Sequence, residues 1–326
     1  MKKMFNFCLL TFLIILLSAC TKVSDPSMPE VRGDEVFLSE VELTQLINLS
    51  TTEEPEHFIS KLDLNSEMLL YINTLDGLNT SSLKMTVTGE QGFTGTDSQS
   101  YKISSELKTD VTIEIERDDQ IVSSVITKND VGYYFTYPNA YFRIDASLKS
   151  DINGLKSYQT VESQKYRNAS LGYHDFYINT MGYNEEFGLQ TTFKSVIDSH
   201  LTPDYKVYKD QNRYSIVFQL SSELMEEQIE QSDLMELSNI TLTDLDDSYG
   251  EFIIVIQDQK VIDIGYHVYI DTIIFAQQAG MDVYGPAKVD IRVRYHSNQD
   301  EFPSMPEDFE QYEFQQYGSL GIESIL

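Results

Sequence analysis

The sequence predicts an α+β fold: one large, strongly curved antiparallel β-sheet, a half-barrel, with helices packed on one face. Three features of the 326-residue chain lead to this prediction. Apolar residues recur at helical spacing ahead of residue 81, they alternate with a period of two from about residue 83 to 147, and this alternation returns after residue 212. Two smaller α+β units would account for the same pattern, and the sequence leaves that alternative open.

Helices are expected ahead of the first strands. The segment 35–50, EVFLSEVELTQLINLS, ends in a short helix for which Ser39 is the candidate N-cap, and Glu42 follows three residues later. The segment 54–80, EPEHFISKLDLNSEMLLYINTLDGLNT, repeats apolar residues at helical spacing and predicts a second helix. Further helices, expected to brace the sheet, are predicted over 191–200 and 221–238.

The first group of strands predicts an antiparallel meander with one apolar face. Apolar and polar residues alternate along these strands, and short polar or proline-bearing stretches separate them. The expected strands are LKMTVTG at 83–89, two in TDVTIEIERDDQIVSSVIT at 109–127 with a turn at Asp118 and Asp119, and two short ones in VGYYFTYPNAYFRIDAS at 131–147 with a hinge at Pro138 and Asn139. Helix and loop are predicted for residues 147–205.

The second group predicts strands on either side of the acidic stretch 221–238. RYSIVFQL at 213–220 is one strand, and AKVDIRVRYHS at 287–297 closes the series. Between them, GEFIIVIQDQKVIDIGYHVYIDTIIF predicts a hairpin that turns near Asp258 and Gln259. In its second arm one face is expected to carry Ile262, Ile264, Tyr266, Val268 and Ile270, and the other face Asp263 and His267.

The first nineteen residues predict a secretory signal peptide. Lys2 and Lys3 precede an apolar run over residues 7–17, which is too short to span a bilayer core that requires about 20 residues. The run leads into Leu-Ser-Ala-Cys at residues 17–20, and this stretch resembles the Leu-x-x-Cys lipobox of bacterial lipoprotein precursors.

The lipobox resemblance implies that Cys20 is the lipid attachment site. In that class a diacylglycerol is joined to the cysteine sulfur, and cleavage leaves this cysteine at the new N-terminus. Two acyl chains anchor a protein stably, so the expected location is the extracytoplasmic face of the cell membrane of a Gram-positive bacterium. The alternative is a cysteine that lies by chance in a signal peptide cleaved elsewhere.

The expected organisation follows from these boundaries. It comprises the signal peptide at 1–19, a flexible tether at 20–35 after the lipidated cysteine, a single domain of two loosely similar halves at 36–312, and a C-terminal tail at 313–326. The only other cysteine, Cys8, lies within the signal peptide, so no disulfide is expected in the mature chain.

The chain is strongly acidic. Its net charge is −29, and loss of Lys2 and Lys3 with the signal peptide leaves 21 of the 23 basic residues against 52 acidic ones, a net charge of −31. Such a surface repels phosphate backbones, so no nucleic-acid partner is expected. It also repels anionic headgroups, which predicts that the protein body stands away from the membrane. A role of the acidity in solubility alone is the alternative.

The order of elements carries a second resemblance. A lipobox, an amphipathic helix leading into a meander, a helical middle, a second meander and the proline-marked exit SNQDEFPSMPEDFEQYEF together resemble the LolA/LprG-like lipoprotein superfamily. The closing P-x-x-P-E-D phrase is also similar to Gram-positive lipoproteins of that fold with no assigned function. The resemblance implies a concave apolar face, covered by helices, that holds an acylated or lipidic ligand. It identifies no ligand-binding residue, and Cys20 alone carries over.

The search for catalytic motifs yields no candidate, so neither an enzymatic activity nor a cofactor is expected. Gly89, Gly92 and Gly95 recur at a spacing of three after a strand, but no helix follows that would bind a phosphate. A flexible turn between strands is therefore the preferred interpretation of these glycines.

Candidate metal ligands are equally weak in this sequence. The histidines are scattered, and none has a second ligand at metal spacing: His57, His174, His200, His267 and His296. His174 and Asp175 are adjacent, which on a strand places them on opposite faces. Asp244, Asp246 and Asp247 offer oxygen ligands but are out of register for an EF-hand, so an acidic turn is preferred to a weak calcium site.

Tyrosines are abundant, with 21 in the chain and a cluster in GYYFTYPNAYF at 132–142. Ordinary strand packing is the preferred interpretation of this cluster, and a cavity mouth or contact surface is the alternative.

Two functions remain compatible with the sequence. The first is a ligand-binding or carrier lipoprotein, in which the sheet and helices enclose an apolar cavity for a lipid or other amphiphile. The second is a non-catalytic interaction module that presents an acidic, tyrosine-rich face to an envelope or host protein. A substrate-binding lipoprotein of a transporter is disfavoured because alternation of strands and helices is missing, and an enzyme is least favoured.

Overall fold

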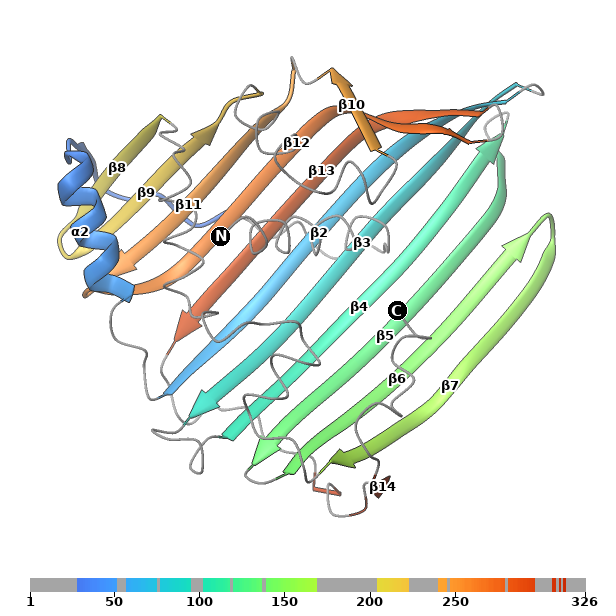
Figure 1. The fold of residues 1–326 in the computed structure, drawn as a ribbon, viewed down its shortest axis with the longest axis horizontal. Helices are drawn as coiled ribbons and strands as arrows, with labels where there is room; N and C mark the ends of the chain where they lie inside the picture. Colours follow the sequence, from blue (N-terminus) through green and yellow to red (C-terminus); the bar gives the residue numbers. More distant parts are fainter. Residues whose placement is uncertain are drawn as a thin grey trace.

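One extended, curved β-sheet dominates the computed structural model of the chain (Figure 1). The structure describes residues 28–51, 57–74, 77–94, 102–117, 120–136, 139–168, 204–222, 240–244, 247–278, 281–296, 307–308, 311 and 313–314. Fourteen strands form the sheet in the order β1-β8-β9-β11-β12-β13-β2-β3-β4-β5-β6-β7-β14, and β10 pairs with β12 outside this path.

Several strands are unusually long for a globular protein, with up to 19 residues. The strands are β1 (Asp34–Val36), β2 (His57–Thr74), β3 (Gly77–Thr94), β4 (Lys102–Arg117), β5 (Gln120–Thr136), β6 (Asn139–Ile152), β7 (Leu155–Asn168), β8 (Tyr205–Asp210), β9 (Arg213–Leu220), β10 (Ile240–Asp244), β11 (Tyr249–Gln257), β12 (Lys260–Gln278), β13 (Met281–His296) and β14 (Glu313–Phe314). Among the described residues the strands pair antiparallel, except for the two-residue parallel pairing of β14 with β7.

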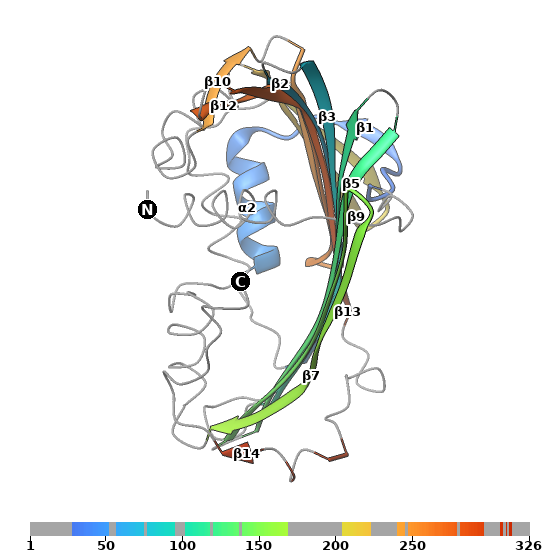
Figure 2. The same ribbon diagram turned by 90° about the vertical axis from the view of Figure 1, so that its right-hand side faces the viewer.

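The predicted α+β class is wrong, because the described chain is almost entirely antiparallel strand. It contains one helix, the 12-residue α2 (Glu40–Thr51), where several helices packed on one face of a half-barrel were expected. Figure 2 shows that the sheet is curved and that α2 lies on its concave side. The helices predicted over 191–200 and 221–238 lie outside the described residues, except for Ser221 and Ser222.

The predicted helix over 54–80 is also wrong: this segment contains β2 and the start of β3. Leu64 and Met68 point to one face of the sheet, in keeping with a period of two. Leu69 and Leu70 then follow on opposite faces, and consecutive apolar residues of this kind fit a helical period as well as a strand. Pairing with β13 and β3 on either side decides the outcome in favour of the strand.

The helix and loop predicted for residues 147–205 are wrong over their described part. β6 runs to Ile152, and β7 follows after a two-residue turn at Asn153 and Gly154. Both turn residues have a positive φ, 52° and 82°, and Asn-Gly is the sequence best suited to such a tight hairpin turn.

The predicted hairpins elsewhere are confirmed. β4 and β5 flank Asp118 and Asp119, β6 begins at Asn139, and β11 and β12 are joined at Asp258 and Gln259. In the second arm of the last hairpin, a bulge opposite Val255 and Ile256 shifts the alternation. Ile262 therefore packs on the convex side with Val217, away from the face that carries Ile264 and Val268.

The predicted cap of α2 is confirmed. The backbone N–H and the hydroxyl of Ser39 both donate to Oε2 of Glu42, at 2.8 and 2.7 Å, and the Glu42 N–H approaches the Ser39 hydroxyl at 3.4 Å. Behind this cap, Leu43 and Ile47 are buried on the concave side. They pack with Val207, Ile216, Phe218, Ile254 and Ile256 of β8, β9 and β11.

The N-terminal described segment lies on the opposite, convex side of the same strands. Met28 packs with Val217, Ile253 and Val255. Pro29 is seated over Gly265, and Nη2 of Arg213 donates to the Glu30 carbonyl at 2.8 Å. β1 then pairs with β8. The part of the predicted tether from Met28 onward therefore lies against the sheet.

We expect Ser39→Ala to destabilise the fold by about 1 kcal/mol, since it removes the cap of the helix that covers β8, β9 and β11. Urea denaturation followed by circular dichroism measures this change. Ser157→Ala, at an exposed hydroxyl on β7, is the control and should change stability by less. Equal midpoints for wild type and Ser39→Ala would contradict a stabilising role of the cap.

Candidate functional site

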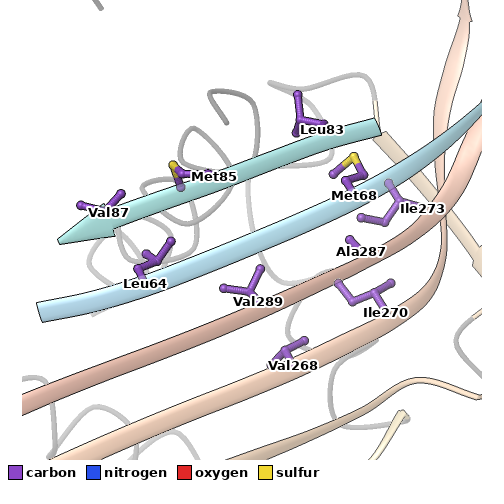
Figure 3. Close-up of a cluster of buried hydrophobic side chains, with 10 residues drawn as sticks. All are labelled: Leu64, Met68, Leu83, Met85, Val87, Val268, Ile270, Ile273, Ala287 and Val289. Atoms are coloured by element: carbon purple, nitrogen blue, oxygen red, sulfur yellow. The ribbon is translucent and has the colours of Figure 1, made fainter. Parts of the chain in front are cut away.

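The main candidate site is an apolar surface on the concave side, which we call the concave stripe. It crosses the four neighbouring strands β12, β13, β2 and β3 (Figure 3). Its residues are Leu64, Met68, Leu83, Met85, Val87, Val268, Ile270, Ile273, Ala287 and Val289, all at most 8% exposed. They come from alternate positions of strands held in register, so their side chains form one continuous surface.

The concave stripe extends toward β4 and becomes accessible there. Leu62 and Ile113 pack against it as half-buried residues. Leu107 of β4 lies on the same face, because it pairs with Gly89 of β3, and it is 38% exposed. A Cβ built on Gly89 would lie 3.0 Å from Cδ1 of Leu107 and 3.6 Å from Cβ of Leu62. The missing side chain of Gly89 thus provides the space between these two leucines.

Further along the sheet, the concave side carries more exposed apolar residues. Ile152 of β6 pairs with Ser123 and with Leu155, which continues this face onto β7. Ile152 is 48% and Leu155 is 78% exposed. An apolar surface thus runs from a buried part at β12 to an accessible part at β7.

The convex side of the same strands is charged and its charges are paired. The ion pairs join Asp263 to Arg292 (2.7 Å), Asp290 to Lys288 (2.8 Å), Glu90 to Lys61 (3.1 Å), Glu67 to Lys84 (3.9 Å), Asp110 to Lys128 (2.7 Å), Asp130 to Lys108 (3.6 Å) and to Arg143 (2.8 Å), and Asp63 to Arg294. Exposed pairs of this kind contribute little to stability, but they bring opposite charges together on this face.

His267 belongs to this charged face, opposite the concave stripe, as the sequence predicted. Its Nδ1 lies 2.5 Å from Oδ1 of Asp290, whose other oxygen binds Lys288. The ring also lies 5.5 Å from that of Tyr249. The sequence did not reveal this pairing, because His267 and Asp290 meet only through the register of β12 with β13. Among the described residues, no group of three His, Cys, Asp or Glu side chains is placed to hold a metal ion.

The tyrosine cluster at 132–142 packs within the sheet where the structure describes its side chains. Tyr134 and Tyr141 are buried, at 0% and 4% exposure. The Tyr134 ring lies over Gly132, and its hydroxyl donates to Glu106 at 2.6 Å on the convex side. For these two tyrosines, the preferred interpretation of strand packing is confirmed.

Other sequence candidates have different outcomes. Gly89 and Gly92 lie inside β3, so the predicted flexible turn there is wrong. His57 and His296 lie on β2 and β13. The residues Cys20, Gly95, His174, Asp175, His200 and Asp246 lie outside the described part.

No helix of the described residues is both long and apolar enough to cross a membrane.

No known protein-family model matches the chain, and no curated protein matches it. Among solved structures it is similar to a beta-barrel-like protein of domain of unknown function DUF1849 from Brucella abortus, with 7% identity over 71% of this chain and 98% of the other and a TM-score of 0.18. It is similar to the KdgM porin at 9% identity over 70% and 98% of the two chains, with a TM-score of 0.11. OccK5 (OpdH) from Pseudomonas aeruginosa has 8% identity over 73% and 98%, with a TM-score of 0.13. Scores this low establish no shared fold.

Tyr266 provides a probe of the concave side, where its ring packs edge-on to Phe252 with centroids 6.2 Å apart. Burial raises the pKa of its phenol from 10.0 to about 12. Between these two pH values the unfolded chain loses this proton while the folded chain keeps it, so stability falls by about 1.4 kcal/mol per pH unit.

We therefore expect Tyr266→Phe to reduce the loss of stability between pH 10 and about 12, measured by urea denaturation at each pH. Tyr158→Phe, at a tyrosine that is 60% exposed, is the matched control and should leave the pH dependence unchanged. Equal pH dependence in wild type and Tyr266→Phe would show that this ring is accessible to water.

Proposed function

We propose that the protein is a non-enzymatic lipoprotein, anchored through a diacylglycerol on Cys20 to the extracytoplasmic face of the cell membrane, that binds or carries an amphiphile on the concave side of its sheet. The observation that supports the ligand is the division of the sheet into an apolar concave side and a charged, paired convex side. The lipid anchor is supported by the lipobox alone.

The apolar surface has the extent that an acyl chain requires. The concave stripe spans four strands about 4.8 Å apart, and the same face continues across β4, β5 and β6 to β7. Each buried methylene contributes about 0.8 kcal/mol, so burial of ten would contribute ~8 kcal/mol before the cost of association is subtracted. A micromolar Kd corresponds to a net binding free energy of about −8.2 kcal/mol, so more than ten methylenes must be buried to reach it once the cost of association is subtracted.

The exposed apolar positions of this face are where a ligand would first make contact. Leu107, Ile152 and Leu155 are apolar, exposed and on the same side as the buried stripe. Met68 and Met85 within the stripe are flexible and adapt to ligands of differing shape. Movement of a ligand from these exposed positions toward the stripe would remove apolar surface of both partners from water.

An interaction module is the second candidate function. The observation that favours it is the start of β7, where residues 155–160 are exposed and Tyr158 is 60% exposed. Strand edges and exposed tyrosines are common features of protein interfaces. In this role the exposed start of β7 would contact an envelope protein without holding a small ligand.

Lipid extraction separates the two functions. The mature chain, produced from residue 21 without its anchor, is purified and extracted with organic solvent, and the extract is analysed by mass spectrometry. A carrier is expected to yield a stoichiometric amphiphile. An empty extract, together with no binding of a fluorescent fatty-acid probe, would favour the interaction module.

Adjacent residues on opposite faces of β4 test where the amphiphile binds. Leu107→Gln removes an apolar contact from the concave side and is expected to weaken binding of a fluorescent fatty-acid probe several-fold. Lys108→Gln introduces the same residue on the convex side and should leave probe binding unchanged. Equal loss in both variants, or in neither, would contradict binding on the concave side.

The lipid anchor has its own test. Cells grown with radiolabelled palmitate should label the wild-type protein but not Cys20→Ala, and the variant should leave the membrane fraction. A Cys20→Ala form that remains membrane-associated to the wild-type extent would contradict the proposed anchor.

A further inference from the structure

We infer that the amphiphile bound on the concave side is anionic, and that its carboxylate or phosphate head group binds the guanidinium of Arg117 at the end of β4. The inference rests on the proposed function and deepens it by naming the class of ligand. Three observations carry it: the charges at the concave positions of the sheet, the way in which the guanidinium is held, and the apolar residues that lead from it to the concave stripe.

Arg117 is the one charged residue at the concave positions of the described strands β13 and β2 to β6. These positions follow from alternation and register. Asn79 of β3 and Arg117 of β4 share a face with Leu83 and Ile113, which belong to the concave stripe or pack against it. Every Asp, Glu, Lys and His of these six strands, and every other Arg, falls at a convex position. The concave positions of these strands thus carry a positive charge and no negative one.

A buried amide orients the guanidinium. Nε of Arg117 donates to Oδ1 of Asn79 at 2.8 Å, and Asn79 is only 8% exposed. Arg117 itself is exposed, and no ion pair joins it to a carboxylate of the described residues. The hydrogen bond to Asn79 engages Nε, so the two terminal amino groups, Nη1 and Nη2, can donate together to a carboxylate or a phosphate.

The charge environment of Arg117 differs from that of the basic residues on the convex side. Arg143 and Arg292 of that side each lie within 2.8 Å of a carboxylate oxygen. Glu114 and Glu116, the nearest acidic residues before Arg117 on β4, alternate to the convex side. The turn that follows β4, residues 118–119, lies outside the described residues. In a chain with a net charge of −29, a cation without such a partner is a favourable place for an anion to bind.

Apolar residues connect Arg117 to the concave stripe. β4 ends at Arg117, next to the start of β5 (Figure 1). The preceding alternate positions of β4 carry Ile115, Ile113 and Val111, and Val111 pairs with Met85 of the stripe. Arg117 and Val111 are six residues apart, or about 20 Å along the strand. A ligand whose head group is bound at Arg117 can therefore lay its apolar chain along β4 toward the stripe, and this arrangement fits an amphiphile with a negative head group.

The test compares ligands that have the same alkyl chain and different head groups. The mature chain from residue 21 is loaded with N-phenylnaphthylamine, an uncharged fluorescent probe of apolar sites. Decanoate, decyl phosphate and decanol then compete for it at neutral pH, below their critical micelle concentrations. At least one of the two anions is expected to bind about tenfold more tightly than decanol, because its head group forms charge-assisted hydrogen bonds with Arg117. Comparison of the two anions distinguishes a carboxylate from a phosphate head group.

Variants assign the preference to Arg117. Arg117→Gln is expected to weaken binding of the preferred anion about tenfold and to leave decanol unchanged. Arg117→Lys keeps the charge but loses the planar fork and the Nε bond to Asn79, so it should retain part of the preference. Arg294→Gln removes the same charge from the convex side and should leave all three affinities unchanged. Far-ultraviolet circular dichroism and the affinity for decanol together check that each variant is folded.

The outcomes separate this inference from the function on which it rests. Equal binding of decanol and both anions by the wild-type protein would overturn the inference, and so would an anion preference that persists in Arg117→Gln or is lost equally in Arg294→Gln. Each of these results would leave the binding of amphiphiles intact. No displacement of the probe by any of the three ligands would contradict the amphiphile function itself, and the inference with it.

Discussion

The structure depends on side-chain alternation along strands that stay in register over their full length. β2 and β3 pair without a shift from His57 opposite Thr94 to Thr74 opposite Gly77, and β3 continues in the same way with β4. Because the side-chain period of a strand is two, this register sends the apolar residues to one face and the charged residues to the other. A slip of one residue would bring Lys84 and Glu67 to the apolar side. Register therefore creates both the concave stripe and the charged convex face.

The two ends of the sheet use this alternation differently. In β9 and β11 both faces are apolar: Ile216 and Ile254 are buried beneath α2, and Val217 and Ile253 are buried beneath Met28. The sequences of these strands are nearly continuous apolar runs, as expected of a sheet that is covered on both sides. From β2 to β5 the concave side carries the apolar cluster, whereas the convex side carries most of the charged pairs. Burial of both faces at β9 and β11 stabilises the fold. The apolar concave side of β2 to β5 provides the surface on which we place the ligand.

Sequence reasoning succeeded where the pattern was local. The Ser39 cap, the turn at Asp258 and Gln259, and the alternation of β4 and β5 are each contained in a few consecutive residues. The α+β class was wrong because β2 carries adjacent apolar residues whose strand identity depends on its pairing with β13, more than 200 positions away in the chain. The turn at Asn153 and Gly154 had a local signal that was missed. Leu107 beside Gly89, and Pro29 over Gly265, could not be predicted, because each contact requires knowledge of which strands and segments become neighbours.

The acidic residues of the convex face do not form the uniformly repulsive surface that the net charge of the sequence suggested. Across the convex face of β12, β13 and β2 to β5, carboxylates meet ammonium or guanidinium groups. On this face the net charge of −29 is therefore not expressed as a uniform layer of carboxylates. Paired charges of this kind keep the convex face hydrated, which promotes solubility. An amphiphile on the concave side would contact apolar side chains instead, so the sheet itself would separate the proposed ligand from these charged groups.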